Sequence, residues 1–119
     1  MKTKFYLQQQ NNSGGYWFQD DNVDVFVFVE AKTVKQAIKK FKKICAPYME
    51  YCECCGYRWD FEYLGEHNGK DEPMIFGENY KEFNNPFWCT NGKAIIYYLD
   101  GTKEIYDLSQ NLPKSRRVE

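Results

Sequence analysis

The chain has 119 residues, which suits a single globular domain, and a domain of this length buries roughly two thirds of its unfolded surface. Hydrophobic residues make up 43%, charged residues 28% and aromatic residues 18%, so disorder and low complexity are excluded. The net charge of −1 excludes a generally basic nucleic-acid binder and a strongly acidic DNA mimic.

Two strands are predicted in the first third of the chain. Lys4–Gln9 is the first candidate, and the polar, Gly-rich stretch 10–15 that follows suits a turn. Residues 23–29 (VDVFVFV) carry β-branched and aromatic side chains without a polar interruption after Asp24. We expect this second strand to be central and buried on both faces.

A helix is predicted after the second strand. Thr33 is placed to cap it, the apolar residues between Val34 and Cys45 follow the spacing of one helical face, and Pro47 ends it. Residues 32–43 hold six lysines and no acid, so the outer face of this helix should be basic.

The second half predicts three further strands around an ordered loop. Residues 57–64 (YRWDFEYL) alternate imperfectly between apolar and polar, which indicates a strand. Residues 70–89 hold several Gly, Asn and Pro residues, so regular structure should be short or absent there. Residues 94–99 and 102–108 flank Asp100-Gly101 in the pattern of a two-residue hairpin.

These elements predict an α+β domain. We expect a small antiparallel sheet of four or five strands, one main helix on one face and a zinc-stabilised loop region. The domain should span residues 1–109, and residues 110–119 should form a flexible C-terminal tail.

The candidate chemistry concentrates in residues 51–59 (YCECCGYRW). Cys52 and Cys55 have the C-x-x-C spacing that lets two thiolates bind one tetrahedral zinc, and Gly56 permits the tight turn that a zinc knuckle needs. A second C-x-x-C is missing, so further ligands must come from the other cysteines or the single histidine. These candidates are Cys54, Cys89, Cys45 and His67.

The four candidate ligands differ in the roles that they could have without binding a metal. Cys45 falls on the apolar face of the predicted helix, where a cysteine is usually a core residue. His67 lies in a polar turn that suits a solvated histidine, and Cys54 needs a bent backbone to reach the ion that Cys55 binds. We assign the metal to Cys52, Cys54, Cys55 and Cys89, with His67 open as an alternative ligand.

Other roles for these cysteines remain open at this stage. They could be reduced thiols without a metal, a redox pair whose only nearby cation is Arg58, or a nucleophile served by His67. Catalytic zinc would need a frame such as H-E-x-x-H, which does not occur. We therefore expect a structural zinc and no enzymatic activity.

Charge and aromatic residues indicate binding surfaces. Residues 46–107 hold 12 acids against 5 bases, so the chain is electrically polarised relative to the lysine-rich helix. More rings are present than one helix and one sheet should need to bury, which favours a partner-binding patch. The rings that we expect near the surface are Tyr16, Trp17, Phe18, Phe83, Phe87 and Trp88.

The motif C-E-C-C-G-Y-R-W at residues 52–59 resembles small phage-encoded proteins that carry C-x-C-C-G-x-R-W. The preceding phrase V-F-V-E-A-K-T-V-K-Q-A-I and the later Y-Y-L-D-G extend this resemblance to about residue 108. A short phage product with a zinc-like cluster and no catalytic frame is also similar in kind to zinc-containing anti-CRISPR inhibitors of type II effector nucleases. Direct matches to the motif are Cys52, Cys54, Cys55, Gly56, Arg58 and Trp59.

These resemblances imply a non-enzymatic, zinc-binding anti-CRISPR protein that binds a type II effector nuclease and blocks its access to nucleic acid. The alternative is a small zinc-knuckle protein that binds nucleic acid through the lysine-rich helix. No apolar run approaches the roughly 18 residues of a membrane-spanning helix, and residues 1–15 lack the apolar core of a secretion signal. We therefore expect a soluble protein of the host cytosol with no membrane partner.

Overall fold

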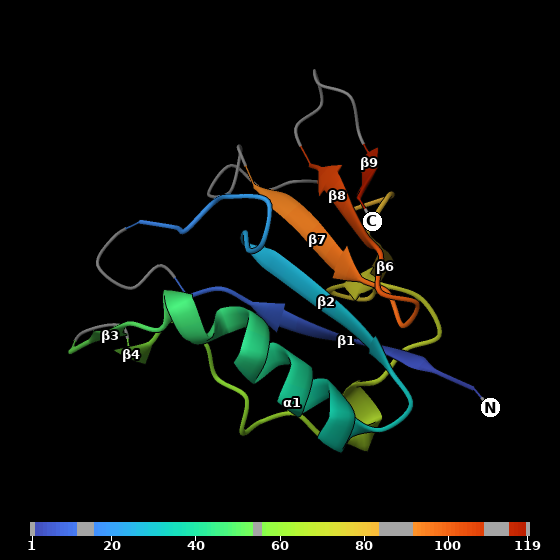
Figure 1. Ribbon diagram of the computed structural model, residues 1–119, viewed down its shortest axis with the longest axis horizontal. Coiled ribbons are helices and arrows are strands. Elements are labelled where there is room, and N and C mark those ends of the chain that lie inside the picture. Colours follow the sequence, from blue (N-terminus) through green and yellow to red (C-terminus); the bar gives the residue numbers. More distant parts are fainter. Residues whose placement is uncertain (1, 12–15, 54–55, 84–91, 109–114, 119) are drawn as a thin grey trace.

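The computed structural model describes residues 2–11, 16–53, 56–83, 92–108 and 115–118, without the side chains of Cys52 and of 115–118. Its main elements are a five-stranded sheet and one helix (Figure 1). They are β1 (Lys4–Gln9), β2 (Phe26–Ala31), α1 (Val34–Cys45), β7 (Lys93–Tyr97), β8 (Lys103–Asp107) and β9 (Ser115–Val118). Smaller elements are η2 (Ala46–Tyr48), β3 (Tyr51–Cys52), β4 (Gly56–Tyr57), η3 (Glu66–Asn68), β5 (Met74–Ile75) and β6 (Glu78–Asn79).

The large sheet has the order β1-β2-β7-β8-β9 and is mixed. Neighbouring strands pair antiparallel except β2 and β7, which run parallel with Phe26 opposite Ala94. The α+β class with one main helix is confirmed, but the prediction of an antiparallel sheet is wrong at this pair. The reason is that the long segment between β2 and β7, which includes α1, crosses over and returns the chain to the same end of the sheet.

The first two predicted strands are present. β1 has the predicted bounds and pairs with β2, with Lys4 opposite Ala31 and Gln9 opposite Phe26. β2 begins three residues later than predicted, at Phe26. It is central, and residues 26–29 are buried, as the uninterrupted apolar run indicated.

The helix matches its prediction closely. Thr33 caps α1, since its Oγ1 accepts a hydrogen bond from the Gln36 backbone at 3.2 Å. Ala37, Phe41 and Cys45 are fully buried four residues apart, which turns one stripe of α1 toward the sheet. The helix ends before η2, which contains Pro47.

Each face of the sheet carries its own core. On one face, α1 packs on Tyr6, Val27 and Val29, together with Trp59 and Leu64 from the segment that follows the helix. On the opposite face, residues from the β5–β6 region pack on the strands. This second core contains Phe26, Phe28, Ile75, Tyr80, Ala94, Ile96 and Tyr106. The loop predicted over residues 70–89 thus forms a second layer on this face of the sheet. Its regular structure is short, as predicted, since β5 and β6 in its described part have two residues each.

Two further predictions need correction. The strand predicted over 57–64 is wrong beyond Tyr57, because β4 ends there and the Asp60 carboxylate accepts from Glu62 N at 3.0 Å, which closes a turn. The predicted β7–β8 hairpin is present, but its connection is longer than two residues. Tyr98 N donates to Thr102 O at 2.9 Å, and Gly101 in between has φ 93°.

The C-terminal segment also differs from its prediction. Residues 115–118 of the expected flexible tail form β9, whose residues from Ser115 to Val118 pair with β8. They extend the large sheet by one strand, because β8 otherwise presents unpaired backbone groups on that side.

Among the described residues, no helix combines the length and apolar character required to cross a bilayer.

Candidate functional site

The cysteine-containing segment ends in a buried arginine that anchors it to the sheet. Arg58 is 0% exposed, and its guanidinium donates to Gln10 Oε1 at 2.7 Å and to Tyr16 O at 2.8 Å. Its backbone is held as well, since Arg58 N donates to Glu50 O at 2.8 Å and Arg58 O accepts from Asn11 N at 2.9 Å. The Arg58 side chain therefore connects the segment after β4 to residues 10–16, more than forty positions earlier in the sequence.

The charge of this arginine is balanced by Glu50. The Arg58 guanidinium forms an ion pair with the Glu50 carboxylate, which also accepts a hydrogen bond from the Tyr16 hydroxyl. The Tyr16 hydrogen bond, and then the one from Arg58, lowers the pKa of Glu50, whereas the bond to Glu50 raises the pKa of Tyr16. The rings of Tyr16 and Phe18 lie 4.6 and 4.5 Å from the guanidinium carbon, in cation–π geometry.

Two glutamines at the end of β1 complete this buried polar layer. The Gln10 amide is fully used, because its nitrogen donates to Phe18 O and Asp24 O while its oxygen accepts from Phe18 N and Arg58. Gln8 donates to Asp60 O at 2.7 Å. A buried polar group costs free energy unless it is hydrogen-bonded, so these bonds fix the path of residues 58–60 along β1.

The C-x-x-C segment lies in a small hairpin. β3 and β4 pair antiparallel with Tyr51 opposite Tyr57 and Cys52 opposite Gly56, and Gly56 has φ 84°. The predicted need for a glycine after the second cysteine is therefore confirmed in the backbone. The Cys52 side chain, Cys54, Cys55 and Cys89 lie outside the described residues, so the predicted ligand set is untested. Within the part of the chain that is described, no three His, Cys, Asp or Glu side chains converge as for a metal.

The two remaining ligand candidates are placed by the structure. Cys45 lies in the core beneath α1 with 0% exposure, and burial raises the pKa of its thiol to about 12, so the prediction that it is a core residue is confirmed. His67 is exposed in η3, next to Lys70, which pairs with Phe5. The hairpin lies at the other end of β1, beside Asn11.

This arrangement separates His67 from the cysteine hairpin. Figure 1 shows β3 and β4 near the C-terminal end of α1, and the short yellow-green helical turn of η3 near its N-terminal end. Phe5 and Asn11 are six residues apart in extended chain, which corresponds to about 20 Å. His67 and the described backbone of the hairpin (Tyr51–Cys52 and Gly56–Tyr57) therefore lie at opposite ends of β1.

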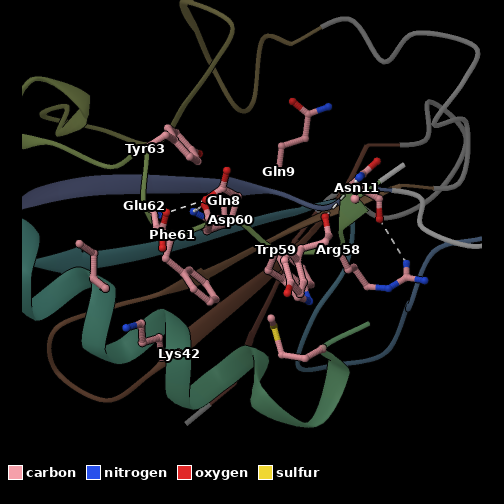
Figure 2. A pocket seen from close by; sticks show the side chains of 14 residues that line it. Gln8, Gln9, Asn11, Lys42, Arg58, Trp59, Asp60, Phe61, Glu62 and Tyr63 are labelled. Atoms are coloured by element: carbon pink, nitrogen blue, oxygen red, sulfur yellow. Dashed lines mark hydrogen bonds between the residues drawn. The ribbon is translucent and has the colours of Figure 1, made fainter. Parts of the chain in front are cut away.

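A groove of about 820 Å³ runs between β1, the segment 56–63 and the C-terminal part of α1. Figure 2 shows Gln8 and Asp60 joined by a hydrogen bond at its base, with Gln9 and Tyr63 directed away from Phe61. Trp59 lines the groove with 2% exposure, and its indole nitrogen has no acceptor among the described residues. The lining residues are Gln8, Gln9, Asn11, Ile38, Lys42, Met49, Gly56, Tyr57, Arg58, Trp59, Asp60, Phe61, Glu62 and Tyr63.

Exposed aromatic side chains gather around this groove. Tyr57 and Tyr63 line it with 61% and 51% of their surface exposed, and the ring of Tyr51, itself exposed, lies 4.8 Å from that of Tyr57. Met49 lines the same groove at 46% exposure. We call Met49, Tyr51, Tyr57 and Tyr63 the tyrosine rim.

The groove has few exposed charged side chains, and acidic ones outnumber basic ones. Asp60 and Glu62 are exposed, as is Lys42, whereas the charge of Arg58 is buried and paired with Glu50. An anionic ligand would meet more negative than positive charge here.

Two buried carboxylates lie outside the groove. Asp24 precedes β2 with 0% exposure, and its Oδ1 accepts from the backbone of Val25 and Lys93, while Oδ2 has no partner among the described residues. Burial raises the pKa of Asp24 to about 6. On the other face of the sheet, Glu104 Oε1 accepts from the Tyr80 and Tyr98 hydroxyls at 2.9 and 2.7 Å. Asp24 thus joins the start of β2 to Lys93 of β7, and Glu104 joins β8 to Tyr80 and Tyr98.

Sequence reasoning did not find the groove or the anchoring role of Arg58. It treated Arg58 as a cation beside a thiol, whereas the structure shows its guanidinium bound to Gln10, Tyr16 and Glu50. It placed Tyr16 and Phe18 near the surface without relating them to Arg58. The residue pair Arg58-Trp59 directly after the knuckle was the available signal, since both side chains are at least 98% buried.

The structure is that of a small α+β domain with a groove beside β1, the edge strand of its sheet. The chain belongs to the family described as Domain of unknown function (DUF7296), whose profile matches residues 3–114. No curated protein and no solved structure matches it.

Proposed function

We propose that this chain is a non-enzymatic, zinc-stabilised inhibitor that binds a host protein through the tyrosine rim. We further propose that the host protein is a CRISPR type II effector nuclease, bound in the host cytosol so that its nucleic acid is excluded. The choice of target rests on the resemblance of residues 52–59 to phage-encoded proteins.

The observation that carries the proposal is the tyrosine rim itself. Four large side chains are 46–61% exposed around one groove, and tyrosine and methionine are enriched where proteins bind each other. The buried anchor Arg58 holds the backbone next to Tyr57 and, through Glu50, next to Tyr51, so less backbone entropy is lost there when a partner binds. A contact of roughly 800 Å² would suffice for specific binding.

Structural zinc fits the hairpin that carries part of this rim. Cys52 is the register partner of Gly56, and the positive φ of Gly56 gives the tight turn that a C-x-x-C knuckle requires. We propose Cys52 and Cys55 as ligands, completed by Cys54 and Cys89. Bound zinc would supply folding free energy and hold Tyr51 and Tyr57 in place.

Titration against a type II effector nuclease tests this function. Inhibition should saturate near one molecule per nuclease and should be greater when the protein is added before target DNA. Complete inhibition at a small fraction of the nuclease concentration, increasing with time, would indicate turnover and refute a stoichiometric binder.

Substitutions in the tyrosine rim test the binding surface. The double variant Tyr51→Ala/Tyr57→Ala should weaken inhibition at least about tenfold, since buried interface tyrosines each contribute on the order of 1–2 kcal/mol. Leu99→Ala is the matched control, because Leu99 is 42% exposed in the β7–β8 connection, outside the groove. Equal losses in both variants would contradict the assignment of the surface.

A second candidate function is nucleic-acid binding by α1. Five lysines around α1 are exposed and none makes an ion pair among the described residues: Lys32, Lys35, Lys39, Lys42 and Lys43. Phosphate contacts release counterions, so binding through this face should weaken steeply as salt concentration rises. Binding through the tyrosine rim should change much less.

A further inference from the structure

The outer edge of β1 is covered at its two ends and open between them. At one end, Phe5 and Lys70 exchange both backbone hydrogen bonds, at 2.8 and 3.0 Å. At the other end, Asn11 N donates to Arg58 O at 2.9 Å. Between these two closures the chain that follows β4 makes no backbone–backbone hydrogen bond to β1 among the described residues; the side chains of Gln8 and Tyr63 hold it beside β1, and the groove lies there.

The register of β1 shows which backbone groups face this opening. Residues of an antiparallel strand turn their N–H and C=O groups alternately toward one neighbour and the other. Gln10 N bonds to Val25 O on the β2 side, whereas Phe5 and Asn11 bond outward, so Leu7 and Gln9 also face outward.

Most of these outward groups have no partner within the described chain. The Leu7 carbonyl accepts from the Tyr63 hydroxyl at 2.9 Å. Leu7 N–H and both backbone groups of Gln9 have no hydrogen-bond partner among the described residues. Gln9 is one of the residues that line the groove, and the register turns its backbone groups outward from β2.

The groove beside this edge suits an extended peptide. Tyr57 and Tyr63 stand exposed along its wall, and the apolar side chains of Ile38 and Phe61 lie in its lining. Only a peptide backbone presents N–H and C=O groups at the two-residue spacing of a strand edge. Nucleic acid is disfavoured, because Asp60 and Glu62 outnumber Lys42 among the exposed charges.

The length of the opening limits what can bind. The two closures are six residues apart, or about 20 Å, so about four residues of extended chain fit between them. A second copy of β1 could not pair along its length, because each copy would meet the segments that close the two ends.

We propose that an extended segment of the partner protein adds to β1 between Phe5 and Asn11 and bonds to the backbone of Leu7 and Gln9. The proposal rests on the proposed function and names how the partner is recognised. Side chains of the bound segment alternate, so every second one meets Tyr57 and Tyr63. A neutral or basic segment is preferred, given the charges of the groove.

The test uses random twelve-residue peptides displayed on phage and selected against the full-length chain. The selected peptide is then synthesised, and its affinity is measured for the unmodified chain, for Gln9→Pro and for Gln9→Ala. Both substitutions remove the side chain, but only proline removes the outward N–H. Proline is tolerated where the N–H faces away from the sheet, so the β1–β2 pairing should survive.

We expect Gln9→Ala to bind within about twofold of the unmodified chain and Gln9→Pro to bind at least about tenfold more weakly. N-methylation of single peptide amides tests the same point without altering the protein. Strand addition predicts that methylation at alternate positions weakens binding and that methylation at the positions between them is tolerated.

Three results would overturn the strand-addition proposal: no enriched peptide, equal binding of both Gln9 variants, or no alternation in the N-methyl series. The proposed function is tested separately by nuclease titration. If Gln9→Pro inhibits the nuclease with the same affinity as the unmodified chain, strand addition fails while the inhibitor function stands. If the unmodified chain inhibits nothing but still binds peptides with the alternating pattern, the function fails while the site stands.

Discussion

The buried carboxylate of Asp24 should make stability fall as pH rises through the mildly acidic range. Asp24 is 0% exposed, and desolvation raises its pKa from 3.8 to about 6, although Val25, Lys93 and Gln19 donate hydrogen bonds to it. Below pH 3.9 the carboxyl is protonated in both the folded and the unfolded chain, so it carries no charge penalty. Above pH 6 the folded chain holds a buried negative charge that the unfolded chain exposes to water.

The size of the effect follows from the two pKa values. The difference between 3.8 and about 6 corresponds to about 3 kcal/mol, at 1.36 kcal/mol for each pKa unit. The stability associated with protonated Asp24 is fully present below pH 3.9 and is lost as pH rises through 6. Small domains are stable by about 5–15 kcal/mol, so this loss is a large fraction of the total.

Asp24→Asn removes the titration and keeps an oxygen that can accept the three hydrogen bonds. Urea unfolding of both proteins between about pH 4 and about pH 7.5 gives the difference in free energy of unfolding. The variant should gain about 3 kcal/mol relative to the unmodified chain across this range. Asp21→Asn changes net charge equally at an exposed position and is the control. A difference for Asp24→Asn that does not vary with pH would refute the reasoning.

Three further predictions concern the region around the hairpin. Arg58→Met should lower the free energy of unfolding by about 3–5 kcal/mol in urea melts, since it leaves Gln10 and the Glu50 ion pair without their partner; an unchanged melt would contradict the anchor role. Elemental analysis should find about one zinc per chain, and Cys52→Ser should lower stability by several kcal/mol and release the metal. Cys45 should resist a thiol reagent in the folded protein, because its thiol is buried with a pKa near 12; its modification at the rate of a free thiol would contradict the packing.

Local sequence patterns were sufficient to predict much of the fold. The bounds of β1, the central position of β2 and the Thr33 cap of α1 follow from side-chain types that act over a few residues. The direction of β7 relative to β2 cannot be predicted from such local patterns, because it depends on the path of more than sixty intervening residues. The alternation of apolar and polar residues in 57–64 led to a wrong prediction of a strand. Arg58 and Trp59 are buried there by long-range contacts and not by strand pairing.

The candidate site was predictable only in part. The spacing of Cys52, Cys55 and Gly56 predicted a tight turn, and the backbone has it. The groove could not be predicted, because it depends on where β1 and the segment 56–63 touch and where they separate. Those contacts join residues about fifty positions apart, so no local pattern encodes them.

The parallel pairing of β2 with β7 has a consequence for the speed of folding. β1, β2 and α1 are consecutive in the chain and contact one another, and β7 and β8 form a hairpin, so each unit can assemble before β2 meets β7. Joining them closes a loop from Phe26 to Ala94, for which the chain-length entropy amounts to roughly 4 kcal/mol. The loop contains the cysteine hairpin and the β5–β6 layer. Metal bound within it would shorten the effective loop before the strands meet and so raise the rate of refolding.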